Sequence, residues 1–270
     1  MNRIVIKYGG AAMQSAALEA AFCEDVLALH ARGDAPVVVH GGGPEINRMI
    51  ERLGGGAPTF VDGLRVTSEA DMSAIEMVLT GVVNPRLVTR LNAIAAGQRN
   101  ARGNAIGVSG KDGATLRAHP IARTDGVDFK RAGDLAAVDP AYLEQLIAAK
   151  WIPVVSPIAI GIDGGSFNVN ADVVAAGVAR ALHADSLLFL SDVAGILEGG
   201  ALIHSITAPE LRAKLAAGVV TGGMAVKARA MLDAIEFGVP MVKLVDGRVP
   251  HSAIEAGEWH GTTLHADRAP

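Results

Sequence analysis

The stretch Val37-Val38-Val39-His40-Gly41-Gly42-Gly43-Pro44-Glu45 decides how this chain is interpreted. A β-branched run ends in three glycines, and a proline and a glutamate then open a helical pattern, which predicts a buried strand, a turn and a helix N-terminus. Glycine lets an anion approach the backbone N–H groups closely, and a helix N-terminus adds unpaired N–H groups. We therefore expect this turn to hold a phosphate; the alternative is a sterically tight turn without a ligand.

Length and composition narrow the class of protein. The chain has 270 residues, is half hydrophobic and carries a formal net charge of −4, which fits one large α/β domain or two lobes sharing a sheet. It has no basic block, so nucleic acid and an anionic membrane are not expected as partners. The single cysteine, Cys23, excludes an intrachain disulfide, and no apolar stretch reaches membrane-spanning length. Because a strand follows Met1 and Asn2 without room for a secretory signal, we expect a cytoplasmic protein.

A second glycine turn follows the first expected strand. Residues 3–8 form an apolar run that ends in Gly9-Gly10, with Lys7 near the end, where α/β sheets place their ligands. We interpret Lys7 as a fixed cation aimed at phosphate; the alternative is a lysine that snorkels at a sheet edge. An amphipathic helix is expected over residues 15–31.

The segment after the first glycine-rich helix predicts a hairpin around Asp62-Gly63. Arg65 lies just past the turn, and its planar fork suits a carboxylate; the alternative is a surface ion pair. A long helix opens at Ser68, and Pro85 interrupts or begins a helix. Lys111 follows a strand over residues 104–109, but the spacing of its glycines is not that of a phosphate-binding loop, so a surface turn with a solvated lysine is expected.

Polar residues concentrate again in Gly164–Asp172. Asn168, Asn170 and Asp172 alternate, so they share one side while the chain is extended, and a helix is expected from Val173. Asp172 is either a cap at the helix start or a carboxylate that orients two lysines, and both interpretations stay open.

The last third repeats the strand–turn–helix arrangement. A buried strand from residue 186 runs into a polar turn with Ser191, Asp192 and Gly195, as a nucleotide loop would. Gly222-Gly223 opens a helix with Lys227 in its first turns, either as a solvated lysine or as a second cation on phosphate. Because strands alternate with helices throughout, we predict a mostly parallel open sheet with helices on both faces.

Taken together, these segments resemble the N-acetyl-L-glutamate kinases of the amino acid kinase superfamily over essentially the whole chain. The opening Lys-Gly-Gly strand is typical of the superfamily, and two further segments point to the acetylglutamate branch. The matching segments are Ile6-Lys7-Tyr8-Gly9-Gly10, His40-Gly41-Gly42-Gly43, Gly63-Leu64-Arg65-Val66-Thr67, Asn168-Val169-Asn170-Ala171-Asp172, Leu190-Ser191-Asp192-Val193 and Gly222-Gly223-Met224-Ala225-Val226-Lys227.

The resemblance implies a three-layer αβα sandwich with a mostly parallel open central sheet. Residues 1–182 would bind the amino acid and dimerise, and residues 183–270 would bind ATP. The implied activity is phosphorylation of the γ-carboxylate of N-acetyl-L-glutamate by ATP, in arginine biosynthesis, with Mg²⁺ held mainly by the ATP phosphates. The carboxylate is already a nucleophile, so no general base is needed.

The resemblance implies a role for each residue of this chain that matches a position in a family motif. Lys7 and Lys227 would stabilise the transferring phosphoryl group, and Asp172 would hold both lysines. The implied substrate residues are Gly42, Gly43, Arg65, Asn168 and Asn170, with Arg65 on the α-carboxylate and Asn168 on the acetamido side. The implied nucleotide residues are Gly9, Gly10, Ser191, Asp192, Val193, Gly195, Ile196, Leu197, Gly222, Gly223 and Met224. No metal-ligating residue is implied.

Arginine-inhibited members of this family carry an extra N-terminal helix that joins dimers into hexamers. Here two residues precede the first strand, and the stretch after His251, through residues 257–262, is abbreviated. We therefore do not expect arginine feedback and predict a homodimer, with the helix around residues 75–79 in the interface.

Alternative functions remain. One is a kinase for aminoadipate or glutamate blocked by a carrier protein; the Asn168–Asp172 segment keeps the acetylglutamate form, and a basic rim at the pocket would favour this alternative. Another is a non-catalytic amino-acid-sensing module, although Lys7, Asp172 and Lys227 are all present. A nicotinamide-dependent dehydrogenase would need G-x-G-x-x-G after the first strand, and Gly9-Gly10-Ala11 does not supply it.

Overall fold

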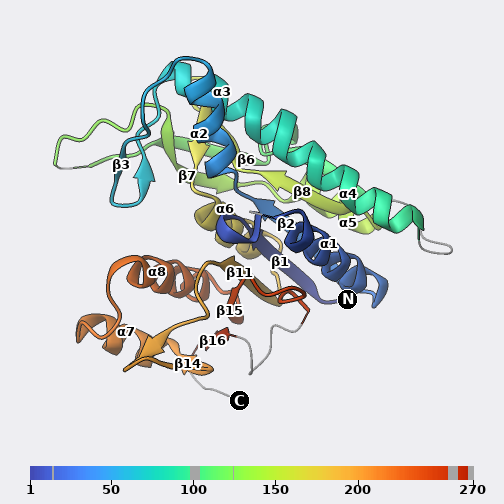
Figure 1. Cartoon of the computed structure of the whole chain (residues 1–270), viewed down its shortest axis with the longest axis vertical. Helices are drawn as coiled ribbons and strands as arrows, with labels where there is room; N and C mark the ends of the chain where they lie inside the picture. The colour runs from blue at the N-terminus through green and yellow to red at the C-terminus, as the bar shows by residue number, and fades with distance from the viewer. Residues whose placement is uncertain (14, 98–103, 124, 255–260, 267–270) are drawn as a thin grey trace. The chain divides into compact units, whose positions relative to one another are not determined.

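A computed structural model describes residues 1–13, 15–97, 104–123, 125–254 and 261–266, so residues 257–260 of the abbreviated stretch lie outside it. The chain forms two compact units. The first unit comprises residues 1–38 and 175–270, and the second comprises residues 39–174. The expected mixed α/β content is confirmed (Figure 1).

A largely parallel sheet forms the centre of the first unit, in the order β14-β16-β15-β11-β1-β2. Its strands are β1 (Arg3–Tyr8), β2 (Ala35–His40, which ends in the second unit), β11 (Ser186–Ser191), β14 (Ser205–Thr207), β15 (Met241–Asp246) and β16 (Gly261–His265). β1, β11 and β15 run parallel, and Lys7 pairs with Phe189 while Ser191 pairs with Asp246. The carboxyl ends of these three strands therefore meet at one edge of the sheet.

Helices accompany this sheet. They are α1 (Ala16–Ala31), α6 (Ala171–Ala181, which begins in the second unit), α7 (Ala208–Ala216) and α8 (Gly222–Glu236), with a 3₁₀ turn at Gly10–Met13 and the hairpin β12 (Leu197–Glu198) and β13 (Ala201–Leu202). Ser15 caps α1, as the predicted helix over residues 15–31 requires, and α1 buries Cys23. Helix α7 contacts α8 and β14, and α8 contacts β15 (Figure 1).

The second unit combines a helical layer with a small barrel. Its elements are α2 (Gly43–Arg52), β3 (Phe60–Val61), β4 (Leu64–Arg65), α3 (Glu69–Val78), a π-helix at Leu79–Val83, α4 (Asn84–Gly97), β5 (Ala105–Ser109), a 3₁₀ turn at Asp112–Ala114, β6 (Leu116–Pro120), β7 (Ala132–Val138), α5 (Ala141–Ala148), β8 (Ile152–Ser156), β9 (Ile158–Gly161) and β10 (Ser166–Val169). β5 pairs with β8 in parallel, and β10, β7, β6 and β9 close the barrel.

Two predicted local structures of the second unit are confirmed in detail. The β3–β4 hairpin turns at Asp62 and Gly63, both with positive φ (50° and 79°), as a tight two-residue hairpin turn requires. Ser68 and Asp71 form a capping box at the start of α3. The helix expected around Pro85 is α4, which begins at Asn84, and the π-helix at Leu79–Val83 connects it directly to α3 (Figure 1).

A buried polar network anchors the glycine turn of the second unit. His40 is 0% exposed; its Nδ1 lies 2.8 Å from Gly41 O, and Asn84 Nδ2 donates to its Nε2 at 3.1 Å. Asn84 Nδ2 also donates to Val154 O at 2.7 Å. Burial lowers the pKa of His40 to about 4, so the ring is neutral and donates from Nδ1. His40 is thus a structural residue.

Within the described residues, no helix is both long and apolar enough to cross a membrane.

Candidate functional site

In the first unit, Lys7 lies at the edge where the strands of the sheet end. It is half-buried on β1, between the buried side chains of Ile6 and Tyr8. The Tyr8 ring stacks on Phe22 with centroids 3.8 Å apart, and its hydroxyl donates to Ala12 O at 2.9 Å. Gly10 follows with a φ of 60°, which glycine adopts without strain. The fixed tyrosine therefore shapes the turn after Lys7.

Two predicted site residues from distant segments come together at the loop after β11. Lys227 Nζ lies 3.6 Å from Asp192 Oδ1, and Ser191 Oγ donates to the same oxygen at 3.1 Å. The Asp192 side chain is 62% exposed. Partial burial acts to raise its pKa, but its own backbone N–H and the charge of Lys227 lower it overall. Lys227 is thus close to the loop, and its role as a second cation on phosphate stays a prediction.

The loop after Asp192 is tied to β16 by one hydroxyl. Thr262 Oγ1 accepts from the Ile196 N–H at 2.7 Å and donates to Ile203 O at 2.6 Å. A Cβ on Gly195 would lie 2.7 Å from that hydroxyl, so this position needs glycine. Ile196 is fully buried, whereas Val193 is half-buried and Leu197 is exposed. The Ile196 side chain therefore belongs to the core. Thr262 was not predicted, since only the fold brings it to the loop.

The N-terminus of α8 offers backbone N–H groups to a ligand. Gly222 is exposed with a φ of 58°, and Gly223 lies in the first turn. Thr221 is the N-cap residue, but its side chain makes no capping hydrogen bond. Met224 is half-buried beside these glycines in the sequence. Such N–H groups at a helix start suit an anion.

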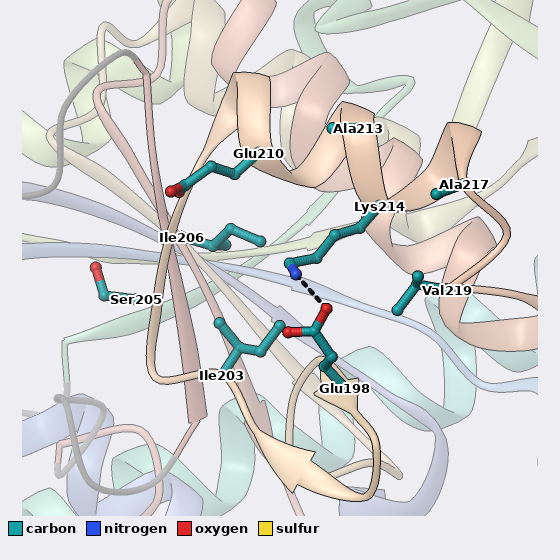
Figure 2. Close-up of a pocket in the computed structure, with 9 residues that line it drawn as sticks. All are labelled: Glu198, Ile203, Ser205, Ile206, Glu210, Ala213, Lys214, Ala217 and Val219. Carbon is teal, nitrogen blue, oxygen red and sulfur yellow. Dashed lines mark hydrogen bonds and ion pairs between the residues drawn. The ribbon is translucent and has the colours of Figure 1, made fainter.

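A pocket of about 460 Å³ is lined by residues in the range 198–219, which lie in the sequence between the loop after β11 and the start of α8 (Figure 2). The pocket lies between the C-terminal end of β12, strand β14 and helix α7. Lys214 Nζ donates to Glu198 Oε1 at 2.5 Å across it, as Figure 2 shows. Its lining residues are Glu198, Ile203, Ser205, Ile206, Glu210, Ala213, Lys214, Ala217 and Val219. Aliphatic walls with a few polar groups suit a flat organic group such as a nucleotide base.

In the second unit, the two predicted glycines of the first turn differ in their surroundings. Gly42 is the N-cap residue of α2, and a Cβ there would lie 2.7 Å from Leu79 Cδ2 and 3.3 Å from Val83 Cγ2. At Gly43 a Cβ would meet nothing within 4 Å. Packing therefore explains the glycine at position 42, whereas the open space at position 43 leaves the backbone accessible to a ligand.

Arg65 is half-buried and is held by a neutral partner. Its Nη2 donates to Asn47 Oδ1 on α2, and its guanidinium carbon lies 4.8 Å from the centroid of the Phe60 ring. Burial lowers the pKa of Arg65, and the charge of Asp71 opposes this effect. The partners found in the structure are thus an amide and a ring, in place of the surface ion pair considered above.

Asn168 is linked to the hairpin that carries Arg65. Its Nδ2 donates to Thr67 Oγ1 at 3.3 Å, and Thr67 Oγ1 donates to Arg65 O at 3.2 Å. Thr67 is fully buried, and its backbone pairs with residues 129–131. The structure therefore links the Asn168 side chain, through Thr67, to the backbone of the hairpin that carries Arg65, although the two residues are distant in sequence.

Asn170 supplies the cap that was considered for Asp172. α6 begins at Ala171, two residues before the expected start, because Asn170 Oδ1 accepts from the Asp172 N–H at 2.7 Å. The predicted alternation is confirmed for Asn168 and Asn170, which are half-buried between buried Phe167 and Val169. Asp172 belongs to the second unit and the two lysines to the first, so its role toward them stays a prediction.

Lys111 corrects an expectation. Its side chain is 35% exposed but is held by two protein partners: its Nζ donates to Glu76 Oε1 at 2.7 Å and to Ser166 Oγ at 3.0 Å, and Ser166 Oγ donates to Glu76 Oε2 at 2.7 Å. Burial acts to raise the pKa of Glu76, but the hydrogen bonds from Lys111 and Ser166 lower it overall. The expectation failed because both partners come from elements far away in sequence, α3 and β10.

A dedicated metal centre was not predicted. Counting only the described residues, no group of three or more His, Cys, Asp or Glu side chains could hold a metal ion.

Comparisons with known proteins identify the family. The family model described as "Amino acid kinase family" matches residues 2–245. The acetylglutamate kinase of Syntrophomonas wolfei is 41% identical over 257 residues, covering 94% of this chain and 86% of the relative. That of Geobacter sulfurreducens is 43% identical over 260 residues, covering 93% and 86%. The crystal structure of smu.665 from Streptococcus mutans superposes with a TM-score of 0.79 at 27% identity, covering 98% of this chain and 99% of that one. The chain therefore belongs to the amino acid kinase family.

Proposed function

We propose that this chain transfers the γ-phosphoryl group of ATP to the γ-carboxylate of N-acetyl-L-glutamate, giving N-acetyl-L-glutamyl 5-phosphate and ADP, the second step of arginine biosynthesis. The observation that carries the proposal is the 41% to 43% identity with acetylglutamate kinases over more than nine tenths of the chain. The glycine turns, cations and amides described above support the same reaction.

The reaction requires the protein to position the two reactants and to stabilise negative charge. A γ-carboxylate oxygen attacks the γ-phosphorus of ATP, the bond from that phosphorus to the β–γ bridging oxygen breaks, and ADP leaves. Catalysis of phosphoryl transfer depends mainly on alignment and on stabilising negative charge. We assign the cationic role to Lys7 and Lys227 and the positioning of both lysines to Asp172.

Substrate recognition is assigned to the second unit. Arg65 would bind the α-carboxylate with its planar fork, and Asn168 would bind the acetamido group. Gly42 and Gly43 would donate backbone N–H groups, and Asn170 completes the polar set. The hydrogen-bonded link from Asn168 through Thr67 to the Arg65 backbone supports this grouping.

Nucleotide binding is assigned to the C-terminal lobe, residues 183–270, with the amino-acid lobe at residues 1–182. At Gly10 and Gly222 a Cβ would meet nothing within 4 Å, so these positions leave room for the phosphates, and Gly9 and Gly223 are assigned beside them. Gly195, whose glycine is required by packing, is assigned with the rest of residues 191–197 and Met224 to the border of the nucleotide. We place the adenine in the pocket of Figure 2, because its lining adjoins both nucleotide segments in the chain. Mg²⁺ would be held mainly by the ATP phosphates and would offset their charge.

The test is ADP release with MgATP and N-acetylglutamate, compared with glutamate, aspartate and N-acetyl-aminoadipate, in the native chain and in Lys7→Ala. We expect turnover on N-acetylglutamate alone and its collapse in the variant. Turnover with another acceptor, or none with any free amino acid, would contradict the proposal. The second outcome would favour a carrier-protein substrate or a regulatory module.

We also propose a cytoplasmic homodimer. The interface helix would be α3, whose Met77 is 51% exposed, with Val82 of the π-helix 43% exposed beside it in the chain. The absence of any disulfide partner for the single cysteine agrees with a reducing compartment. Light scattering that gives a mass other than twice 27.7 kDa would contradict the dimer.

A further inference from the structure

The helix that follows the first glycine turn carries a side chain that the reaction as described does not use. Asn47 lies on α2, one helical turn after Gly43, and its Oδ1 accepts a hydrogen bond from Arg65 Nη2. We infer that Asn47 is a positioning residue that orients the guanidinium of Arg65 through a neutral acceptor and so preserves its charge for the carboxylate of the substrate. This inference rests on the proposed function, in which Arg65 binds that carboxylate.

The chemistry of the acceptor carries the argument. A carboxylate in the place of Asn47 would hold the guanidinium more tightly but would neutralise it. An amide oxygen accepts one N–H and leaves the net charge and the other donors of the fork for a ligand. Because Arg65 is half-buried, water screens this charge less than at the surface, and an incoming carboxylate is attracted more strongly.

The carboxylate that acts on Arg65 through space is already hydrogen-bonded to another residue. Asp71 acts on Arg65 through space, but its Oδ2 accepts from both the backbone N–H of Ser68, at 3.3 Å, and the Ser68 hydroxyl, at 2.7 Å. The bond from the Ser68 N–H and the reciprocal bond from the Asp71 N–H to Ser68 Oγ, at 3.0 Å, form the capping box of α3, and together with the hydroxyl bond they keep the carboxylate in place. Asn47 is therefore the group whose hydrogen bond sets the direction of the fork.

The ring of Phe60 completes the support. It lies 4.8 Å from the guanidinium carbon and is itself 53% exposed, at the first position of the hairpin that carries Arg65. A ring against one face of a guanidinium leaves its edges available, because the donors of arginine lie in its plane. Asn47 and Phe60 thus restrict the rotation of the fork from two elements, α2 and β3.

The test compares Asn47→Asp with Asn47→Ala, and the control is Arg52→Gln. The control changes the net charge by the same amount as Asn47→Asp, on the same helix, at an exposed residue. We expect Asn47→Asp to raise the KM for N-acetylglutamate about tenfold, the effect of losing one charge-assisted contact, with kcat and the KM for ATP close to native values. Asn47→Ala should raise the same KM less, and Arg52→Gln should leave it unchanged.

Binding of N-acetylglutamate measured by calorimetry separates the two proposals, and thermal unfolding verifies that each variant is folded. Native binding without turnover, weakened by Asn47→Asp, would overturn the proposed kinase and support the positioning role. Turnover with the same KM in Asn47→Asp and the native chain would overturn the positioning role alone. A native chain that does not bind N-acetylglutamate would overturn both. If Asn47→Asp does not fold, Asn47→Ala decides: an unchanged KM there overturns the positioning role.

Discussion

The two regions proposed to bind ligands hold their polar side chains in different ways. In the second unit, Arg65 is bonded to Asn47, and Asn168 is bonded to buried Thr67. In the first unit, Lys227 and Asp192 are 3.6 Å apart, and Asp192 is exposed. Fixed side chains suit the recognition of a small acid by shape, whereas glycine-bordered backbone and long lysines suit phosphates, whose charge moves during the reaction. The predictions below test this difference, from the largest expected effect to the smallest.

The largest effect should come from the lysine of the exposed pair. Lys227→Ala should lower kcat by about 10² to 10³, or roughly 3 to 4 kcal/mol, because it removes the cation that we assign to the transferring phosphoryl group. The KM for N-acetylglutamate should change little. Steady-state kinetics measures both parameters, and Arg212→Ala, which breaks an exposed ion pair with Glu236 at 2.6 Å, is the control. Equal effects of the two variants would refute the assignment.

The buried network of the second unit should make stability depend on pH. The pKa of His40 is lowered to about 4, so its stabilising effect is complete above the unfolded value near 6.5 and is lost as the pH falls toward 4. This amounts to about 3 kcal/mol across that window. Urea unfolding of the native chain and of His40→Asn at several pH values should show a flatter profile in the variant.

The control for this measurement is His119→Asn, since His119 is exposed. A profile flattened equally by both substitutions would mean that His40 is not the group responsible.

Arg65→Lys should separate shape recognition from charge. Lysine keeps the charge but lacks the planar fork, so the KM for N-acetylglutamate should rise about tenfold, or about 1.4 kcal/mol. Arg32→Lys makes the same exchange at an exposed arginine in the other unit and should leave the KM unchanged. A native KM in Arg65→Lys would mean that a point charge suffices and that the contrast between the regions is wrong.

The smallest effect should distinguish the two glycines of the first turn. Gly42→Ala should lower the free energy of unfolding by about 1 kcal/mol, because its Cβ would crowd Leu79 and Val83. Gly43→Ala should leave stability unchanged but lower kcat/KM, since its Cβ meets only the space assigned to ligand. Urea unfolding and kinetics on both variants measure the contrast, and the reverse pattern would contradict it.

Local patterns were enough for much of the fold. The helix after Ser15, the hairpin at Asp62-Gly63 and the strand that ends at His40 were all predicted, because caps, turn residues and apolar periodicity act over a few neighbours. The start of α6 was placed two residues late, because the capping side chain is Asn170 and the choice among neighbouring polar residues depends on their orientation.

The sequence by itself determined the alternation of strands and helices, the glycine turns and the residue types able to bind phosphate and carboxylate. Only the tertiary structure decided which side chains meet. It pairs Lys111 with Glu76, ties the Ile196 loop to Thr262 and places Asn47 against Arg65. The physical reason is that periodicity and turn chemistry are local, whereas each of these contacts joins elements that come together only when the chain packs.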